Sequence, residues 1–289
     1  MSISSPPFTA HFSTLAPAYD VVLCDVWGVV HNSIVSFPEA TTALTRFRAQ
    51  GGTVVLITNA PRRSEVVIGI LDSLKVPRES YDAIVSSGDV TRAIIAGRAG
   101  QSAFLVGPER DLSMFEGFDT PLVGIDQADY VVCSGLYDDN SETPQDYSAM
   151  IARLRSRGLT MVCANPDIVV ERGEKLVYCA GAIADLYAAA GGEVMYAGKP
   201  YRPIYEQAVA VAEERRGRAT APARMLAIGD SIHTDLKGAV AFGIDCLFVT
   251  AGIHAEELGG RERPDAAALG EAFAAAGLAP RAVMQRLVW

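Results

Sequence analysis

Polar residues that could bind and cleave a phosphate ester follow several short apolar runs of the chain. Asp25 follows Val-Val-Leu-Cys, and Asp230 follows Met-Leu-Ala-Ile-Gly. Thr58 and Asn59 follow Val-Val-Leu-Ile, and Lys199 lies within Gly-Lys-Pro. In open parallel sheets, ligands bind beyond the carboxyl ends of the strands. If the apolar runs are such strands, one edge of a sheet would gather carboxylates, a hydroxyl group and an ammonium group.

These residue types indicate chemistry on an anionic substrate. A phosphate ester repels an incoming carboxylate unless a cation lies between them, and Mg²⁺ suits that role because it binds carboxylates, water and phosphate. Asp25 and Asp230 would supply the carboxylates, and Asp25 could attack phosphorus to form an aspartyl-phosphate. Lys199 and Thr58 would offset charge on the phosphoryl oxygens. Asp235 could fix the waters of the metal or hold Lys199.

Short apolar runs alternate along the chain with helical patterns, which is typical of a parallel sheet covered by helices. In the outer parts of the chain we predict strands at 21–24, 53–58, 84–86, 225–228 and 246–249, and helices at 38–50, 64–74, from about 89, from 203, at 234–241 and at 266–276. In the middle we predict strands at 103–106, 130–133 and 160–163, and helices at 146–157 and 183–190.

The fold class that this pattern predicts is α/β, with a doubly wound parallel-sheet core and a second α/β domain inserted into it. The core would comprise residues 1–97 and 194–289, and the inserted domain residues 98–193. A segment of that length is sufficient for a domain of its own.

Composition limits the classes of partner. The 289 residues carry a formal charge of −9 without a long basic stripe, which argues against nucleic acid as the main partner. No apolar stretch approaches the roughly 18 residues of a membrane span, and residues 1–18 do not resemble a signal peptide. Five scattered cysteines without a Cys-x-x-Cys pair favour a reducing compartment, so we expect a cytoplasmic protein that acts on a small phosphorylated metabolite.

Four segments, taken in order, resemble the motifs of the haloacid dehalogenase superfamily. They are Asp25-Val-Trp-Gly-Val, Ile-Thr58-Asn59, Gly-Lys199-Pro and Gly-Asp230-Ser-Ile-His-Thr-Asp235. The long insertion after the second motif is similar to that of the class IIA subgroup, which contains pyridoxal and nitrophenyl phosphate phosphatases. Ser86-Ser87-Gly88, Asn165-Pro166-Asp167 and Gly181-Ala182 also resemble that subgroup. Each motif alone is weak, but four in order with the insertion are specific, and the resemblance spans about residues 19–252.

The resemblance implies a role for each matching residue. Asp25 would be the nucleophile and a Mg²⁺ ligand, the Trp27 backbone carbonyl a second ligand, and Asp230 a third. Asp235 would be a supporting acid. Phosphate would be bound by a set of three residues, Thr58, Asn59 and Lys199. The inserted segment would be a cap that closes over the site, selects the leaving group and forms a homodimer surface.

Asn165 and Asp167 lie in the inserted segment, around Pro166. They would contact the substrate from the cap, or they would form a plain turn around the proline.

Trp27 stands where phosphatases of this superfamily have an Asp that protonates the leaving oxygen and then activates water. Indole has an N–H donor but no proton to exchange near neutral pH. General acid–base catalysis contributes about 10²–10⁴-fold, or roughly 3–5 kcal/mol of barrier. Trp27 could instead anchor the cap interface or stack on an aromatic substrate.

Several interpretations of this substitution remain open. The enzyme could be slow or restricted to good leaving groups, or His31 could supply the missing proton. It could instead be a dehalogenase, because haloacid dehalogenases also carry an aromatic residue there, although Asp230 and Asp235 would then have no metal to bind. The fourth interpretation is a non-catalytic protein that binds a phosphorylated ligand.

Overall fold

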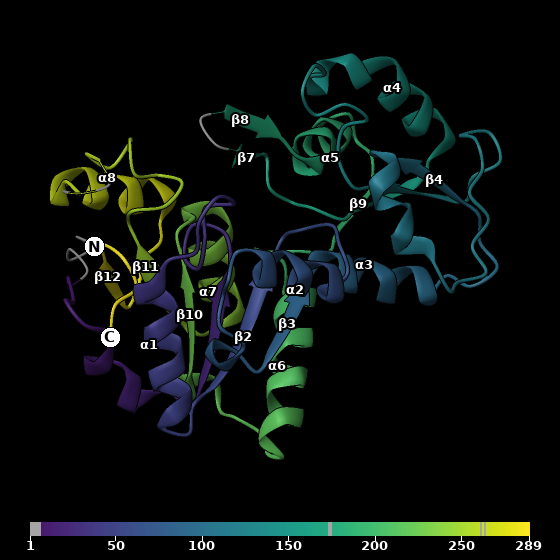
Figure 1. Cartoon of the computed structure of the whole chain (residues 1–289). Coiled ribbons are helices and arrows are strands. Elements are labelled where there is room, and N and C mark those ends of the chain that lie inside the picture. The colour runs from purple at the N-terminus through teal and green to yellow at the C-terminus, as the bar shows by residue number, and fades with distance from the viewer. Residues whose placement is uncertain (1–6, 173–174, 261, 263) are drawn as a thin grey trace. The chain divides into compact units, whose positions relative to one another are not determined.

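The structure is a computed structural model that describes residues 7–172, 175–260, 262 and 264–289. The described residues form two compact units (Figure 1). The first unit is built from Met1–Thr58, Ile68–Val85 and Tyr205–Trp289, and the second from Asn59–Val67 and Ser86–Ile204. The second unit therefore interrupts the first in sequence. The domain limits predicted at residues 98 and 193 stay a prediction.

The strands predicted for the core belong to one six-stranded sheet. Its order is β12-β11-β10-β1-β2-β3. The strands are β1 (Val21–Asp25), β2 (Thr53–Thr58), β3 (Ala83–Ser86), β10 (Met225–Gly229), β11 (Asp245–Val249) and β12 (Ala282–Met284). Strand β1 runs parallel to both β2 and β10, and β10, β11 and β12 are also parallel to one another. These strands are continuous apolar runs because both faces of a parallel sheet are covered.

The strand order reverses between β1 and β10. From β1 the chain proceeds outward to β2 and β3, whereas from β10 it proceeds in the opposite direction to β11 and β12. Since crossover connections between parallel strands are right-handed, helices after β1 and after β10 lie on opposite faces of the sheet. Cys24 pairs with Ile228, so Asp25 and Gly229 end neighbouring strands at this switch point. The doubly wound α/β class predicted from the sequence is confirmed.

The helices outside the inserted sheet begin near the predicted positions. They are α1 (Pro38–Ala49), α2 (Ser64–Ser73), α3 (Ser87–Ala96), α6 (Arg202–Arg216), α7 (Lys237–Phe242) and α8 (Ala266–Ala276), with 3₁₀ turns at Phe12–Thr14, Ala16–Ala18, Arg78–Ser80 and Pro222–Arg224. Helix α3 starts two residues before the predicted Asp89, because Ser86 and Asp89 form a capping box. The helix predicted at 234–241 opens instead as a π-helical turn, Ile232–Leu236, and continues as α7.

The second unit contains a parallel sheet of its own, in the order β4-β5-β6-β9. Its elements are β4 (Ala103–Val106), β5 (Tyr130–Cys133), β6 (Thr160–Cys163), β9 (Val194–Tyr196), α4 (Ser148–Arg157), α5 (Ala180–Ala189) and 3₁₀ turns at Glu109–Phe115 and Pro144–Tyr147. Val131 and Cys133 enter one apolar cluster, and Tyr130 and Val132 enter another. This alternation buries both faces of the sheet. The antiparallel strand pair β7 (Val169–Arg172) and β8 (Lys175–Tyr178) was not predicted, nor were β9 and β12.

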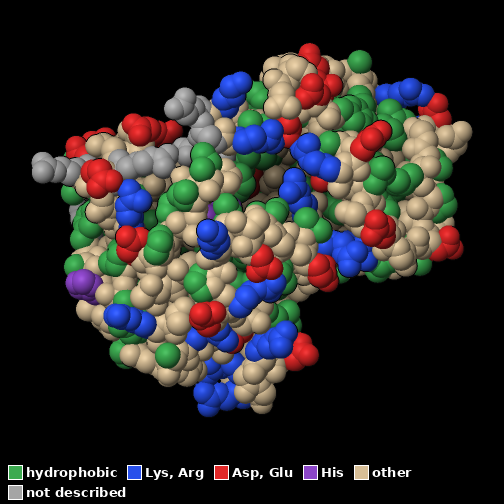
Figure 2. Space-filling model, viewed as in Figure 1, with side chains coloured by type: hydrophobic (Ala, Val, Ile, Leu, Met, Phe, Trp, Pro, Cys, Tyr) green, Lys and Arg blue, Asp and Glu red, His purple; other side chains and the backbone are tan. Residues whose placement is uncertain are grey.

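The cysteines, the helices and the surface charges bear on the predictions made from composition. All five cysteines are buried free thiols. None of the helices in the described part of the chain has both the length and the apolar character that crossing a bilayer requires. Basic and acidic side chains are interspersed on the face seen in Figure 2. The prediction that residues 1–18 are not a signal peptide falls partly on residues 1–6, which lie outside the described residues.

Candidate active site

The loop after β1 presents two of the predicted metal ligands. Asp25 is the last residue of β1 and is only 6% exposed. Beyond it the chain turns back, because the His31 N–H donates to the Val26 carbonyl at 3.2 Å and the Gly28 N–H donates to the His31 carbonyl at 2.8 Å. Among the described residues, no hydrogen bond is accepted by the intervening Trp27 carbonyl. The Trp27 carbonyl, two residues after Asp25, therefore stays a predicted metal ligand.

Asp230 is clamped at the end of β10. Its Oδ2 accepts a hydrogen bond of 2.7 Å from the Ile253 N–H. A Cβ added at Gly28 or at Gly252 would overlap the same carboxylate oxygen, so both glycines pack directly against it. Gly28 also has a φ of +84°, a conformation that residues with a side chain rarely adopt. Gly28, Gly252 and Ile253 were not predicted to have a role, and nothing in their local sequence pattern connects them with Asp230.

Asp235 is positioned by the π-helical turn that follows β10. Its Oδ2 accepts from the Ser231 N–H at 3.1 Å, and a Cβ at Gly229 would overlap the carboxyl group. Ser231 also caps this turn, because its Oγ accepts from the Thr234 N–H at 3.3 Å. Single π-helical turns are frequent at functional sites because they re-aim one side chain. Here the turn directs Asp235 back toward the end of β10.

Asp25, Asp230 and Asp235 lie together. Each offers one carboxylate oxygen, and the three oxygens lie within 4.8 Å of one another. All three side chains are buried, at 6%, 5% and 2% exposure. Buried carboxylates at such distances repel one another unless a cation or a proton compensates the charge. A donor set of carboxylate oxygens fits a hard divalent cation such as Mg²⁺.

Thr58 ends β2 beside this cluster. Asp25 pairs with Ile57 in the parallel register of β1 and β2, so Thr58 follows directly after the partner of Asp25. Thr58 is buried. The first unit therefore collects Asp25, Thr58, Asp230 and Asp235 at one edge of the sheet, with the Trp27 loop beside them.

The second unit brings the other predicted site residues together. The Asn59 side chain accepts from the Lys199 N–H at 2.7 Å and donates to the Lys199 carbonyl at 3.1 Å and to Asp167 Oδ1 at 2.9 Å. The Asp167 N–H donates in turn to Asn165 Oδ1 at 3.1 Å. Both amide hydrogens of Asn59 are thus used, which favours a positioning role over the predicted direct contact with phosphate. A phosphate site that combines residues of both units stays a prediction.

His31 is poorly suited to replace the missing acid. It is 4% exposed, and burial lowers its pKa to about 4. Its Nδ1 accepts a hydrogen bond from the Ser33 N–H at 2.9 Å, which requires that nitrogen to be unprotonated. The imidazole is therefore uncharged near neutral pH. Its ring centre lies 5.6 Å from that of Trp27, so His31 packs against the residue that stands in place of the missing acid.

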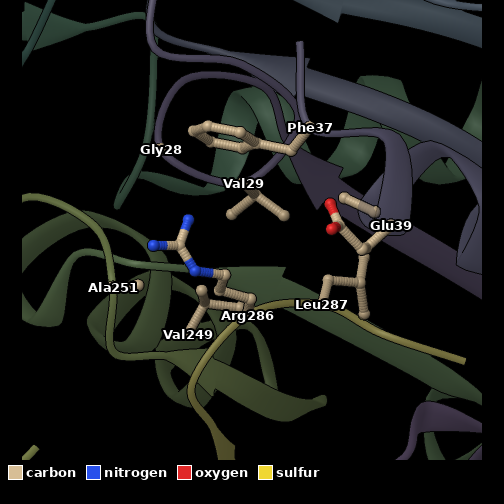
Figure 3. A pocket seen from close by; sticks show the side chains of 9 residues that line it. Gly28, Val29, Phe37, Glu39, Val249, Ala251, Arg286 and Leu287 are labelled. Atoms are coloured by element: carbon tan, nitrogen blue, oxygen red, sulfur yellow. The ribbon is translucent and has the colours of Figure 1, made fainter. Parts of the chain in front are cut away.

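A small pocket is lined in part by Gly28 and Val29 (Figure 3). Apolar side chains such as Val29, Phe37 and Leu287 line most of it, and Arg286 and Glu39 add charge. The Arg286 guanidinium forms an ion pair with Glu262 Oε1 at 3.0 Å, so its charge is already compensated. None of the predicted site residues lines this pocket.

Comparison with known proteins agrees with this fold. Residues 22–120 match the sequence family described as haloacid dehalogenase-like hydrolase, and residues 196–276 match a second family of similar hydrolases. A crystal structure of a haloacid dehalogenase-like hydrolase from Brucella suis is 45% identical in sequence, covers 97% of this chain and 100% of its own, and superimposes with a TM-score of 0.86. The chain therefore belongs to the haloacid dehalogenase-like family of hydrolases, as its four motifs predicted.

More distantly related proteins are also similar to this chain. The p-nitrophenyl phosphatase of Archaeoglobus fulgidus is 21% identical, with coverage of 93% of this chain and 97% of its own and a TM-score of 0.72, and shows the same fold. D-glycerol 3-phosphate phosphatase of Mycobacterium tuberculosis is 27% identical over 252 residues, or 83% of this chain. This chain spans 65% of the length of that relative.

Proposed function

We propose that this protein is a Mg²⁺-dependent phosphatase of small phosphate monoesters, with Asp25 as the nucleophile. The observation that carries the proposal is the buried cluster of Asp25, Asp230 and Asp235, whose oxygens lie within 4.8 Å of one another. The relatives from Mycobacterium tuberculosis and Archaeoglobus fulgidus add support, since both are named as phosphatases. Asp25, Asp230 and the Trp27 carbonyl would hold the cation, which supplies neutralisation of the phosphoryl charge when bound.

The chain's own residues then perform two displacements. A carboxylate oxygen of Asp25 forms a bond to phosphorus while the bond from phosphorus to the ester oxygen breaks, and the leaving oxygen takes up a proton from solvent water. Water next attacks the aspartyl-phosphate, which releases inorganic phosphate and regenerates Asp25. Thr58 and Lys199 bind the phosphoryl oxygens, and Asp235 supports the cluster through its contacts with Gly229 and Ser231.

Trp27 restricts the leaving groups. Its side chain cannot protonate an alkoxide, and His31 is uncharged near neutral pH. Aryl and acyl phosphates have aryloxide and carboxylate leaving groups. These anions depart without protonation because their conjugate acids are stronger than alcohols. We therefore propose slow turnover of alkyl phosphates and faster turnover of aryl and acyl phosphates.

Five buried free thiols support a reducing compartment, which we propose to be the cytoplasm.

The test is phosphate release from 4-nitrophenyl phosphate and acetyl phosphate, with Mg²⁺ and with chelator, beside the Asp25→Asn variant. We expect Mg²⁺-dependent release that the variant lacks. Release no faster than that of Asp25→Asn, with phosphorylated ligands still bound, would favour the non-catalytic binding protein.

A parallel assay of halide release from 2-haloacids addresses the dehalogenase alternative, which the aromatic Trp27 favours. Metal-independent halide release would defeat the phosphatase proposal. We expect none, because a metal-free reaction gives no use to three clustered carboxylates.

A further inference from the structure

Asn59 holds the backbone of Lys199 at two points. Its Oδ1 accepts from the Lys199 N–H at 2.7 Å, and its Nδ2 donates to the Lys199 carbonyl at 3.1 Å. The two residues are separated by 140 positions in the sequence. A paired donor and acceptor fix both the distance and the rotation of the peptide groups that they bind, which a single hydrogen bond does not. The position of the Lys199 main chain therefore depends on one side-chain amide.

The contact is closely packed and excludes water. Asn59 and Lys199 are 4% and 3% exposed. A Cβ at Gly198 would overlap Asn59 Oδ1 and approach Ser87 Oγ to 2.9 Å, so no side chain larger than hydrogen fits beside the amide. Buried hydrogen bonds without access to water are costly to lose because no solvent replaces the missing partner.

The second amide hydrogen of Asn59 reaches the loop that follows β6. Nδ2 donates to Asp167 Oδ1 at 2.9 Å. That loop is fixed at its other contacts, since the Asp167 N–H donates to Asn165 Oδ1 at 3.1 Å. On helix α5, a Cβ at Gly181 would overlap the carbonyl oxygens of Pro166 and Asp167, so the helix packs directly on the loop. Asp167 therefore provides Asn59 with an anchor on β6 and α5.

We propose that Asn59 is a positioning residue that joins Lys199 to the 165–167 loop of the inserted unit, and that Asp167 acts on phosphate binding through Asn59. The kinetic part of this inference rests on the proposed phosphatase function. Lys199 stabilises the phosphoryl group only if its ammonium lies within hydrogen-bond reach. A displacement of about 1 Å in a binding group costs about 10²-fold in rate.

The kinetic test compares Asn59→Ala, Asn59→Asp, Asp167→Asn and the exchanged pair Asn59→Asp/Asp167→Asn, with Asn140→Asp as a matched control at an exposed position of the same unit. With 4-nitrophenyl phosphate we expect Asn59→Ala to lower kcat/KM about 10²-fold and to raise the inhibition constant of inorganic phosphate. Asn59→Asp should be at least as impaired, because it removes both donors and faces Asp167 with a second carboxylate. The control should keep the activity of the unmodified protein.

The exchanged pair separates positioning from a general loss of structure. A side-chain amide at position 167 can donate to a carboxylate at position 59, so the pair should recover about tenfold of the activity lost in Asn59→Asp, with a parallel recovery of phosphate inhibition. An exchanged pair no better than Asn59→Asp, or an Asn59→Ala variant with unchanged kinetics, would overturn the proposal. If Asn59→Ala does not fold, Gly198→Ala provides the second test, because its Cβ displaces the Asn59 amide and should raise the same inhibition constant.

Hydrogen exchange tests the positioning without any turnover. The Lys199 amide should be protected in the unmodified protein and in Asn140→Asp, and should exchange at least tenfold faster in Asn59→Ala. Mass spectrometry of a peptide that spans Lys199 measures this exchange. Unchanged exchange would refute the positioning role even if the protein is a phosphatase. Faster exchange in a protein that releases no phosphate would refute the proposed function while the contact stands.

Discussion

Gly28 packs directly against the carboxylate of Asp230, so that a methyl group at position 28 would overlap Asp230 Oδ2. The two residues come from different halves of the first unit, and Gly28 lies three positions after the proposed nucleophile. The contact joins the loop after β1 to the end of β10. It places the backbone of one predicted metal-binding segment against the side chain of the other.

Gly28→Ala should abolish Mg²⁺ binding and activity. The added Cβ displaces Asp230, and alanine at φ +84° costs about 1–2 kcal/mol of conformational strain. The matched control is Gly51→Ala, since Gly51 has a φ of +88° but no atom within 4 Å of an added Cβ. Both variants should lose similar stability from strain, measured by urea unfolding, but only Gly28→Ala should lose activity. Equal activity in the two variants would contradict the close contact.

Asp230→Asn should stabilise the metal-free protein and remove its response to Mg²⁺. Replacing one of three buried carboxylates that lie within 4.8 Å relieves repulsion, so the melting temperature in chelator should be equal or higher. In the unmodified protein, Mg²⁺ at 100 times its Kd should add about 2.7 kcal/mol of stability, and in the variant almost none. Thermal unfolding with Mg²⁺ and with chelator measures both effects. A Mg²⁺ response that survives the substitution would exclude Asp230 as a ligand.

Trp27→Asp should raise phosphatase activity on alkyl phosphates. A carboxyl group at this position can protonate the leaving oxygen, a function worth about 10²–10⁴-fold. The gain should be much smaller for 4-nitrophenyl phosphate, whose leaving group requires little protonation. Trp27→Asn serves as the control in steady-state assays with both substrates, because the Asn side chain has the shape of Asp but no acidic proton. If the two variants gain equally, removal of the indole rather than proton transfer explains the change.

Asp139 should make the stability of the inserted unit sensitive to acid. Arg172 and Arg110 lie at 2.7 and 2.6 Å from Asp139 Oδ2, and hydrogen bonding to Arg172 foremost lowers the pKa of Asp139 to about 2. The lowered pKa means that the folded state favours the carboxylate. Its contribution is therefore complete above about pH 4 and disappears as the pH falls toward 2.

Asp139→Asn should lower the free energy of unfolding by about 1–2 kcal/mol at pH 7. The difference from the unmodified protein should become smaller below pH 4. Urea unfolding at several pH values measures it. Asp126→Asn is the control, because Asp126 pairs with Arg153 in an exposed ion pair of little expected value. A pH-independent difference between Asp139→Asn and the unmodified protein would point to packing instead of charge.

Elements with a long apolar run or a strong helical pattern could be predicted from the sequence with little error. Strand β2 and helix α8 occupy the predicted ranges, 53–58 and 266–276, without change. Strands β9 and β12 were missed because each has three residues, too few for an alternation to be recognised. Their strand geometry depends on pairing with β6 and β11, which are distant in sequence.

Local sequence therefore determined the strand ends, the carboxylate, hydroxyl and lysine groups that follow them, and the family to which the chain belongs. These features depend on residue type and on spacing within a few positions. Tertiary structure alone decided that Gly28, Gly252 and the Ile253 amide hold Asp230, that burial keeps His31 uncharged, and that Asn59 holds Lys199. Such contacts join residues as distant in sequence as Gly28 and Asp230, and no local pattern encodes which side chain fills the space beside another once the chain has packed.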